Sequence, residues 1–396
     1  MTSTMDADVI IIGGGVVGSS IAYHLLTDGF TGRVVVVERD PTYARASSNL
    51  AMGGIRQQFS SALNIQLAQY SIDFYTDFDH RFSLKGSAAA SFQQRGYLFL
   101  VDTKGRERFE ARVKEQHALG AHVSRLSVAE LEHLVPGMTV EDLEFGVLGP
   151  NDGYANPKAV LAGFREGAKT VGAEFITGEV TAIHREGNRV YGVEIERKDN
   201  INAAVVVNAA GPYAARVAEL AGVTIPVQPV RQHLFRAFLR TPTSKRYPMI
   251  VDPSGVHWRH DDPQHIDEQD RFIVARTKLD EPPGENFVCD MSRWEQDFFP
   301  ALQRRLPDHS DYTHVEGWSG LYEMTPDHNP VFGSVPDRSG FLLANGFSGH
   351  GLMMAPATGK ALSELIRLNR YETFDLTPLH VTRFNKNRLF RDDATL

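Results

Sequence analysis

The sequence predicts a two-domain α/β protein, with a parallel sheet in one domain and a mixed or antiparallel sheet in the other. Three observations predict this fold. A strand–helix–strand pattern opens the chain, a second strand–turn–helix pattern lies near its end, and alternating strand-like segments lie between them. The chain of 396 residues is also longer than one average domain, which has roughly 150 residues.

The N-terminal residues have the pattern of a βαβ unit. Val9–Ile12 is a continuous aliphatic run, as expected for a strand that is buried on both faces of a parallel sheet. Glycines follow it, and the apolar residues of Ser19–Leu26 then recur at helical spacing. Arg33–Val37 is a second aliphatic run, so we expect two parallel strands joined by a helix.

Later segments extend the same sheet. Val180–Ile183 and Val190–Ile195 flank a turn and predict a hairpin, and Ala204–Ala209 predicts a short buried strand. Phe341–Ala344 predicts another strand, followed by a glycine-rich turn and a helix over Thr358–Leu368.

Both domains are expected to be assembled from pieces that are separated in the sequence. The segments between the sheet-forming runs have alternating strand-like patterns and also contain aromatic residues, histidines and prolines. We assign residues 86–149 and 223–324 to a substrate-binding domain. The larger domain would comprise residues 1–85, 150–222 and 325–375, and residues 376–396 would form a C-terminal tail.

Composition excludes several classes of protein. Lys plus Arg number 41 and Asp plus Glu 49, for a formal charge of −8, so binding to nucleic acid or to an anionic membrane is not expected. The single Cys289 cannot form an internal disulfide. The longest apolar run, Val9–Val17, is shorter than the roughly 20 residues of a membrane span. The N-terminus has no signal-peptide pattern, and we expect a cytoplasmic protein.

The first glycine cluster predicts a Rossmann-like dinucleotide site. Gly13, Gly15 and Gly18 fit G-x-G-x-x-G between a predicted strand and a predicted helix. Such glycines permit the tight turn, the approach of a pyrophosphate and close helix packing. Glu38 ends the second strand, where an acidic residue binds ribose hydroxyls. This motif alone leaves NAD and FAD both open.

A second glycine cluster, Asn345–Gly351, favours a flavin. It follows the strand Phe341–Ala344 and precedes a helix. A loop with few side chains lets backbone N–H groups approach a flat ligand, and the positive end of the helix would stabilise an anionic reduced ring.

These and other motifs, in this order, resemble the FAD-dependent D-amino-acid oxidase/sarcosine oxidase (DAO) family. The other matching segments are Ser47–Asn49 with Gly53–Arg56, Asn208–Pro212, and Gly320–Asp327 with Asn329–Gly333. The resemblance is greatest to sarcosine oxidase β subunits, dimethylglycine dehydrogenases and β-type proline dehydrogenases. It implies a Rossmann-like FAD domain and a substrate domain whose sheet covers the flavin. The cofactor-binding residues that we expect are Gly13, Gly15, Val16, Val17, Gly18, Glu38, Arg39, Ser47, Ser48, Gly53, Gly54, Val180, Ala210, Gly211, Gly320, Gly346, Phe347, Ser348, Gly349, His350 and Gly351.

The chain departs from the family at positions that matter for the flavin. Some relatives attach FAD through a Cys close to where Gly320 stands, and others through a His close to Ala51. Neither nucleophile is present, so we expect non-covalent FAD. A Lys that assists oxygen in the monomeric sarcosine oxidases is replaced here by an aliphatic residue, Ile273 or Val274, which leaves the electron acceptor open.

Arg56 is the leading candidate to bind a substrate carboxylate, because a guanidinium can form two parallel bonds to it. It aligns with a carboxylate-binding Arg in the sarcosine oxidases, although a structural ion pair is the alternative. Arg56, His257 and His350 are the candidate catalytic residues. Further candidates for contact with the substrate are Tyr97, His233, His257, Arg259, Arg276 and Met353. No metal-binding pattern is present.

We therefore expect an FAD-dependent oxidoreductase that oxidises the C–N bond of a small amino acid, with a secondary amine (sarcosine-like, N-alkylated or proline-like) favoured. Hydride transfer to flavin N5 would leave an imine that water hydrolyses, and O2 or an electron-transfer partner would reoxidise the flavin. The alternatives are oxidation of a 2-hydroxy acid, a non-catalytic or partner-dependent flavoprotein subunit, and an NAD dehydrogenase. Homo- and hetero-oligomers both remain open.

Overall fold

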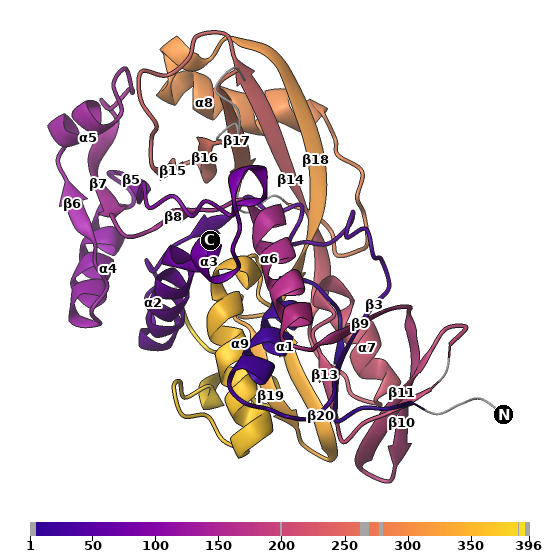
Figure 1. The fold of residues 1–396 in the computed structure, drawn as a ribbon. Helices are drawn as coiled ribbons and strands as arrows, with labels where there is room; N and C mark the ends of the chain where they lie inside the picture. The colour runs from indigo at the N-terminus through magenta and orange to yellow at the C-terminus, as the bar shows by residue number, and fades with distance from the viewer. Residues whose placement is uncertain (1–4, 199, 262–268, 277–279, 387, 393–396) are drawn as a thin grey trace.

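The strands form two large sheets, which confirms the predicted α/β fold class (Figure 1). The computed structural model describes residues 5–198, 200–261, 269–276, 280–386 and 388–392. In the view of Figure 1, β14, β17 and β18 of one sheet lie in the upper half, and β3, β13 and β20 of the other lie in the lower half. The predicted domain boundaries stay predictions.

The first sheet has a parallel centre, in which β20, β13, β2, β3 and β9 are neighbours in that order. Its remaining strands are short or antiparallel and lie at one edge. The strands are β1 (Met5–Asp6), β2 (Val9–Ile12), β3 (Val34–Glu38), β9 (Glu174–Thr177), β10 (Val180–Glu186), β11 (Arg189–Ile195), β12 (Ile201–Asn202), β13 (Val205–Asn208), β19 (Val331–Val335) and β20 (Arg338–Asn345).

Strand β2 is buried on both faces, as its unbroken aliphatic run predicts. Val9 and Ile11 belong to one apolar cluster, and Ile10 and Ile12 belong to the cluster on the other face. The predicted hairpin is also confirmed, since β10 and β11 pair antiparallel. The N-terminal unit is therefore the centre of the sheet and fixes where its glycine turn lies.

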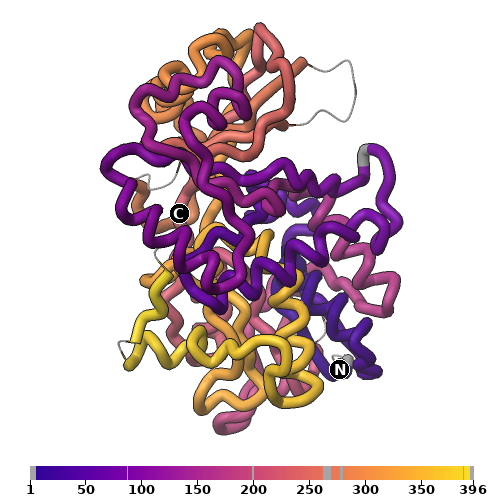
Figure 2. Tube along the Cα trace, turned by 90° about the vertical axis from the view of Figure 1, so that its left-hand side faces the viewer, coloured from indigo at the N-terminus to yellow at the C-terminus, as the bar shows by residue number. Residues whose placement is uncertain are grey.

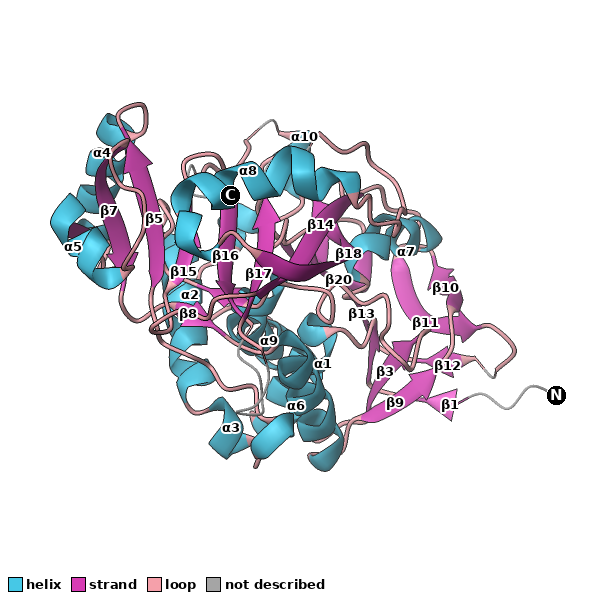
Figure 3. Cartoon of the chain, turned by 90° about the horizontal axis from the view of Figure 1, so that it is seen from above, coloured by secondary structure: helices cyan, strands magenta, loops and turns pink. Residues whose placement is uncertain are grey.

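Helices cover one face of this sheet, where α1, α6 and α9 lie side by side (Figure 3). Figure 2 shows that the N-terminal and C-terminal segments both contribute to the lower half of the molecule, although they are far apart in the sequence. The smaller helix α7 packs on the opposite face. The helices of this part are α1 (Val16–Thr27), α2 (Ala62–Thr76), α3 (Phe78–Arg81), α6 (Pro157–Thr170), α7 (Ala214–Leu220), α9 (Gly351–Leu368) and α10 (Thr382–Asn385).

Helix α9 begins at Gly351, seven residues before the predicted start at Thr358. The prediction was wrong because Pro356 lies inside the helix, and proline lacks the N–H that would bond the carbonyl four residues earlier. Tyr75 supplies the missing donor: its hydroxyl donates to the carbonyl oxygen of Leu352 at 2.5 Å. A tertiary contact thus allows the helix to begin beside the glycine-rich loop.

The second sheet is mainly antiparallel and has the order β18-β14-β17-β16-β15-β5-β7-β6. Its strands are β5 (Tyr97–Asp102), β6 (Ser124–Leu126), β7 (Leu143–Gly149), β14 (Gln228–Leu239), β15 (Met249–Val251), β16 (Val256–His260), β17 (Arg271–Arg276) and β18 (Tyr312–Met324). Helices α4 (Arg106–Ala118), α5 (Val128–Leu134) and α8 (Phe299–Arg305) pack on it, and β4 (Gly54–Ile55) pairs with β8 (Gly153–Tyr154) beside it.

The two faces of the second sheet have different neighbours. Trp258 and Phe235 lie on the face that α8 covers. Tyr97 and Ile273 lie on the other face, in a cluster that includes Met52 from the N-terminal part of the chain. That second face therefore meets the part of the chain that carries the glycine turn. Within the described ranges, no helix has the length and apolar character needed to cross a membrane.

We expect Gly18→Ala to destabilise the protein by about 3 kcal/mol, because overpacking against backbone cannot be relieved by a side-chain rotation. The added Cβ would lie 1.9 Å from the Gly13 carbonyl oxygen. Gly105→Ala is the control, since its Cβ would have no atom closer than 3.4 Å. Thermal unfolding of both variants measures the difference, and equal melting temperatures would contradict the packing argument.

Candidate active site

A cavity of about 890 Å³ lies where the glycine turn, the ends of the central strands and the start of α9 meet. Its walls come from segments that are far apart in the sequence, as expected if both glycine clusters, Gly13–Gly18 and Asn345–Gly351, bind one cofactor. The predicted cofactor residues that line it are Gly13, Gly15, Val16, Val17, Glu38, Arg39, Ser47, Ser48, Val180, Ala210, Gly211, Phe347, Gly349 and Gly351.

The N-terminus of α1 opens into this cavity. Gly13 has a φ of +104°, and a Cβ there would lie 2.4 Å from the Ala209 carbonyl oxygen, so the turn requires glycine. The N-cap residue, Gly15, forms no side-chain cap, and Ser48 accepts the N–H of Val16 at 3.1 Å. The helix dipole and its N-terminal N–H groups therefore favour an anionic group, such as a pyrophosphate, at this end of the cavity.

Glu38 is held rigidly at the carboxyl end of β3. Its two carboxylate oxygens accept the N–H groups of Gly14 at 2.8 Å and Asp40 at 2.9 Å. The neighbouring Arg39 guanidinium lies 3.5 Å from the centre of the Tyr213 ring. This is the position that the sequence assigns to ribose recognition, and the role itself remains a prediction.

The other predicted cofactor residues support the walls instead of lining them. A Cβ on Gly18 or Gly53 would lie within 2.2 Å of a backbone oxygen, and one on Gly346 would lie 2.4 Å from Thr325. The residues in this group are Gly18, Gly53, Gly54, Gly320, Gly346, Ser348 and His350.

Strand β18 holds the second glycine loop in place. Glu323 accepts the N–H of Gly346 at 2.8 Å, and burial raises the pKa of its carboxyl to about 7. Gly349 has a φ of +95°, and a Cβ there would lie 2.6 Å from the ring of Tyr322. Tyr322 and Glu323 both line the cavity, so the loop is fixed against the strand where both meet the cavity.

Arg56 lies completely buried directly after strand β4. It donates to the carbonyl oxygen of Gln58 at 2.5 Å and to Nε2 of His350 at 3.5 Å. Its guanidinium carbon lies 4.3 Å from the centre of the Phe59 ring, within the range of a cation–π contact. Burial lowers the pKa of this guanidinium, and a hydrogen bond to Tyr97 acts in the opposite direction. An arginine remains charged nonetheless.

His350 and His257 are neutral imidazoles near this cation. His350 Nδ1 donates to the Phe347 carbonyl at 3.2 Å, which leaves Nε2 as the acceptor for Arg56. Burial, with the charge of Arg56, lowers the pKa of His350 to about 3. His257 Nδ1 faces the Gly255 carbonyl at 3.1 Å, and burial lowers its pKa to about 4. Neither ring adds a positive charge near neutral pH.

Aromatic side chains of β5 complete this region. Tyr97 and Phe99 stack with ring centres 5.5 Å apart, and Phe99 lies 5.6 Å from the Arg56 guanidinium carbon. Burial raises the pKa of Tyr97 to about 12, so its hydroxyl stays protonated. The predicted residues Arg56, Tyr97, His257 and His350 are thus brought together, although their roles remain predictions.

The remaining substrate candidates have other neighbours. Arg259 donates to the Met52 carbonyl at 2.6 Å, which ties β16 to the N-terminal part of the chain. Arg276 points to the opposite face of the sheet from Ala275 and pairs with Asp297 at 2.9 Å. His233 also lies on that far face, stacked on Phe235. Met353 is buried in the apolar core around α9.

Asp152 is a buried residue of the site that sequence reasoning missed. Its carboxylate accepts the backbone N–H of Gln57 at 3.1 Å and the side-chain amide of Gln58 at 3.2 Å. The same amide donates to the Tyr97 carbonyl at 2.7 Å. Asp152 therefore ties the Arg56 segment to strand β5. No local pattern signals this role, because the partners are about a hundred residues away. The sequence indicates Tyr322 and Glu323 only as members of the Gly320–Asp327 segment and assigns neither of them a role.

A model of the family described as FAD dependent oxidoreductase matches residues 8–365. The chain belongs to this DAO family. Bovine FAD-dependent oxidoreductase domain-containing protein 1 (Bos taurus) is 32% identical, over 96% of this chain and 85% of that protein. Mouse mitochondrial dimethylglycine dehydrogenase (Mus musculus) is 26% identical over 96% of this chain and 44% of its own length. The crystal structure of L-proline dehydrogenase from P. horikoshii superposes with a TM-score of 0.88 at 25% identity, over 98% of this chain and 100% of that one.

The residues that line the cavity of this FAD-dependent oxidoreductase suit FAD. The alternative that the protein is an NAD dehydrogenase is therefore wrong. The cavity is lined by residues at the N-termini of both α1 and α9, and neither N-cap residue, Gly15 or His350, forms a side-chain cap. The two ends suit a pyrophosphate and an electron-accepting ring. Among the described residues, no cluster of three or more His, Cys, Asp or Glu side chains is arranged to hold a metal ion.

We expect acid precipitation to release all of the FAD. Ala51, which lines the cavity, offers no nucleophile. Cys289 lies against Gly317, whereas Gly320 faces Leu50 on the opposite side of β18. The flavin absorbance of the supernatant measures release, and Cys289→Ala should give the same value. Flavin retained in the protein pellet would contradict this prediction.

Asp152 should make stability depend on pH. Burial raises the pKa of its carboxyl from 3.8 to about 7, so the folded state keeps the proton to higher pH than the unfolded state. The stability that it contributes is complete below pH 3.8 and is lost as pH rises through 7. The melting temperature of Asp152→Asn relative to wild type should therefore rise across this window.

Asp375→Asn is the control for this profile. Hydrogen bonds from Thr377 hold the pKa of the Asp375 carboxyl below its ordinary value. Its contribution to stability is present at higher pH and is lost as pH falls, so the trend relative to wild type has the opposite sign. A flat profile for Asp152→Asn would show that the buried carboxyl is not protonated in the folded protein.

Proposed function

We propose that this FAD-dependent oxidoreductase oxidises the C–N bond of a small amino acid, with a secondary amine as the substrate class. The observation that carries the proposal is Arg56, a fully buried guanidinium beside the second glycine loop. Its contacts include a carbonyl, a neutral imidazole and the face of an aromatic ring. A cation in such surroundings favours an anionic ligand, and a carboxylate matches its two-pronged geometry.

Bound FAD supplies the hydride acceptor. The protein binds and orients the substrate. Arg56 would hold the carboxylate, while Tyr97, Phe99 and Phe59 would exclude water from the remainder of the molecule. Exclusion of water disfavours an ammonium and so favours the neutral amine. The neutral amine holds the lone pair that assists removal of hydride from the adjacent carbon.

Amine oxidation suits this site better than oxidation of a 2-hydroxy acid. A hydroxyl group requires a base to accept its proton, and the sequence suggests His257 for that role. Burial lowers the pKa of His257 to about 4, which makes it a weak base near neutral pH. A neutral amine requires no such base.

The names of the relatives support the same substrate class. The mouse relative is named for dimethylglycine, and the P. horikoshii structure for L-proline. Both compounds carry a carboxylate next to a substituted amine. This chain spans less than half of the mouse protein, so the comparison concerns only the matched portion of that relative.

The electron acceptor is proposed to be O2 or an electron-transfer partner. Ile273, one of the two aliphatic residues considered for the place of the oxygen-assisting Lys, is buried on the same face of the sheet as Tyr97. Val274 lies on the opposite face. An aliphatic side chain on the site face provides no charge to assist reduction of O2, which favours slow reoxidation by air.

The first test is anaerobic titration of the FAD-loaded protein with sarcosine, dimethylglycine, L-proline, glycine, D- and L-amino acids and 2-hydroxy acids. A secondary amino acid should bleach the flavin absorbance, and kcat/KM should rise with pH because the neutral amine reacts. Admission of air then separates an oxidase from a dehydrogenase. Bleaching by hydroxy acids alone would contradict the proposal.

Arg56→Lys should raise KM for the amino acid by about 100-fold, because an ammonium loses the paired bonds to the carboxylate. The value of kcat at saturation should change much less. Arg276→Lys is the matched control, since Arg276 pairs with Asp297 on the far face of the sheet. Equal effects of the two substitutions would refute the assigned role of Arg56.

A further inference from the structure

The C-terminal segment returns to the substrate site through Asp392. This side chain is 6% exposed. Its carboxylate accepts the N–H of Ser60 at 3.0 Å, the hydroxyl of Ser60 at 2.9 Å and the N–H of Ser61 at 3.0 Å. Ser61 is the N-cap residue of α2. An acidic group from the end of the chain therefore occupies the positive end of a helix that packs against α9.

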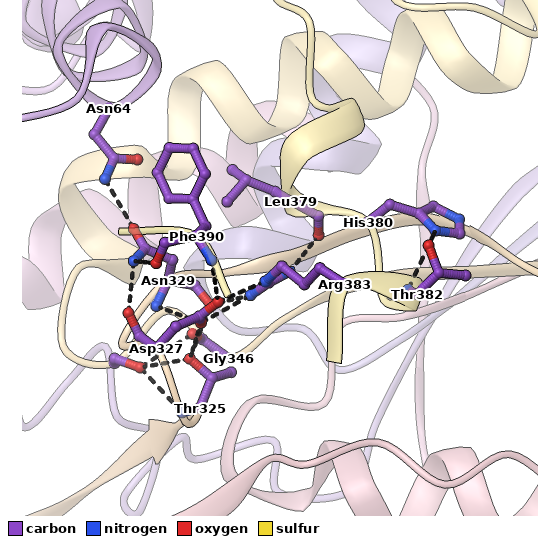
Figure 4. Close-up of polar contacts among 11 residues, drawn as sticks. Asn64, Thr325, Asp327, Asn329, Gly346, Leu379, His380, Thr382, Arg383 and Phe390 are labelled. Carbon is purple, nitrogen blue, oxygen red and sulfur yellow. Dashed lines mark hydrogen bonds and ion pairs between the residues drawn. The ribbon is translucent and has the colours of Figure 1, made fainter. Parts of the chain in front are cut away.

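A second set of contacts fastens the preceding part of this segment. Figure 4 shows Arg383 of α10 directed at Asp327, which accepts from its Nε at 2.7 Å and Nη2 at 3.0 Å. The N–H of Phe390 donates to the same carboxylate at 3.0 Å. Both side chains of the ion pair are almost fully buried. This pair fixes the course of the chain toward Asp392.

The network also reaches the second glycine loop. Asn64 donates to Asp392 at 2.9 Å and to Asn329 at 2.8 Å (Figure 4 shows the bond to Asn329). The hydroxyl of Thr325 donates to the Asn329 carbonyl at 2.9 Å, and the N–H of Thr325 donates to Ser348 at 3.2 Å. The segment is thus connected to the loop that lines the cavity as well as to α2.

The anchored Ser60 is adjacent in the sequence to a residue that contacts Arg56. Phe59 precedes Ser60, and its ring lies 4.3 Å from the Arg56 guanidinium carbon. The same ring packs edge-on against His350, with ring centres 5.3 Å apart. The negative charge of Asp392 is also close enough to raise the pKa values of Arg56 and His350, against the effect of burial.

We propose that Asp392 is a positioning residue for Arg56: by holding the Ser60–Ser61 turn, it fixes the Phe59 ring against which the guanidinium lies. The inference rests on the proposed role of Arg56 in binding a carboxylate. It makes the C-terminal segment part of the substrate site. Arg56 is then held from the second sheet through Asp152 and from the end of the chain through Asp392.

Glu364 provides a matched control. Its carboxylate is also buried and accepts two backbone N–H groups, those of Glu372 at 2.8 Å and Thr373 at 2.9 Å, together with the Thr373 hydroxyl. It fixes a turn after α9 and has no contact with Phe59 or Arg56 in this network. Glu364→Gln therefore measures the loss of a similar buried carboxylate away from the site.

The test compares Asp392→Asn with Glu364→Gln in the FAD-loaded protein. The probe is propionate, and its Kd is measured from the perturbation of the flavin spectrum. Asp392→Asn should weaken propionate binding by about tenfold, which is within the usual range of coupling between residues linked through shared neighbours. Glu364→Gln should leave the Kd unchanged. The melting temperatures of both variants measure how much stability each substitution removes.

A double-mutant cycle with Arg56→Lys decides whether the effect passes through Arg56. In the Arg56→Lys background, Asp392→Asn should weaken propionate binding much less than in wild type. Equal effects in both backgrounds, or equal effects of Asp392→Asn and Glu364→Gln, would overturn the inference. Ser60→Ala is the milder variant if Asp392→Asn does not fold, with a smaller loss in the same direction expected and an unchanged Kd counting against the proposal.

The cycle also separates this inference from the proposed function. If Arg56→Lys leaves the Kd for propionate unchanged, the role of Arg56 in carboxylate binding fails, and the inference fails with it. If Arg56→Lys weakens binding while Asp392→Asn does not, only the positioning role of Asp392 is refuted.

Discussion

Burial of the Arg56 guanidinium is the constraint around which the site is organised. A charged group removed from water is strongly destabilised unless surrounding dipoles and charges replace its hydration. Here the replacement includes the Gln58 carbonyl, the neutral His350 ring and the face of Phe59. Each of these must be held in place. The need to hold them explains why so many buried polar contacts converge on a few residues after β4.

These buried polar contacts join helices, strands and loops that are far apart in the sequence. Asp152 connects the Arg56 segment to β5 of the second sheet, and Arg259 fastens β16 to the Met52 carbonyl. Glu323 on the long strand β18 fixes the glycine loop that begins α9. The flavin cavity and the cation are thereby positioned by the same two sheets. A shift of one sheet relative to the other would disturb both the cavity and the cation.

The sequence predicts the parallel centre of the fold well, because burial on both faces demands unbroken aliphatic runs such as Val9–Ile12. The predicted start of α9 was wrong by seven residues, because the Tyr75 hydroxyl that donates to the Leu352 carbonyl is distant in the chain. Alternation along β16 places Trp258 on the face that α8 covers and His257 on the other face, opposite Ala275. Arg276 shows the limit of this reasoning, because a charged residue at a strand end does not reveal which face carries the site.

Residues that act through other residues leave no local sequence signal. Asp152 and Asp392 are ordinary acidic residues in the printed sequence, and only the fold shows that both carboxylates hold neighbours of Arg56. Arg56 itself could be found because it follows a glycine pair that the resemblance places beside the flavin. A charged group that contacts a ligand tends to occur within a motif, whereas its supports can come from any part of the chain that reaches it. The C-terminal segment is one such part, since Asp392 bonds the start of α2 and Phe390 bonds Asp327.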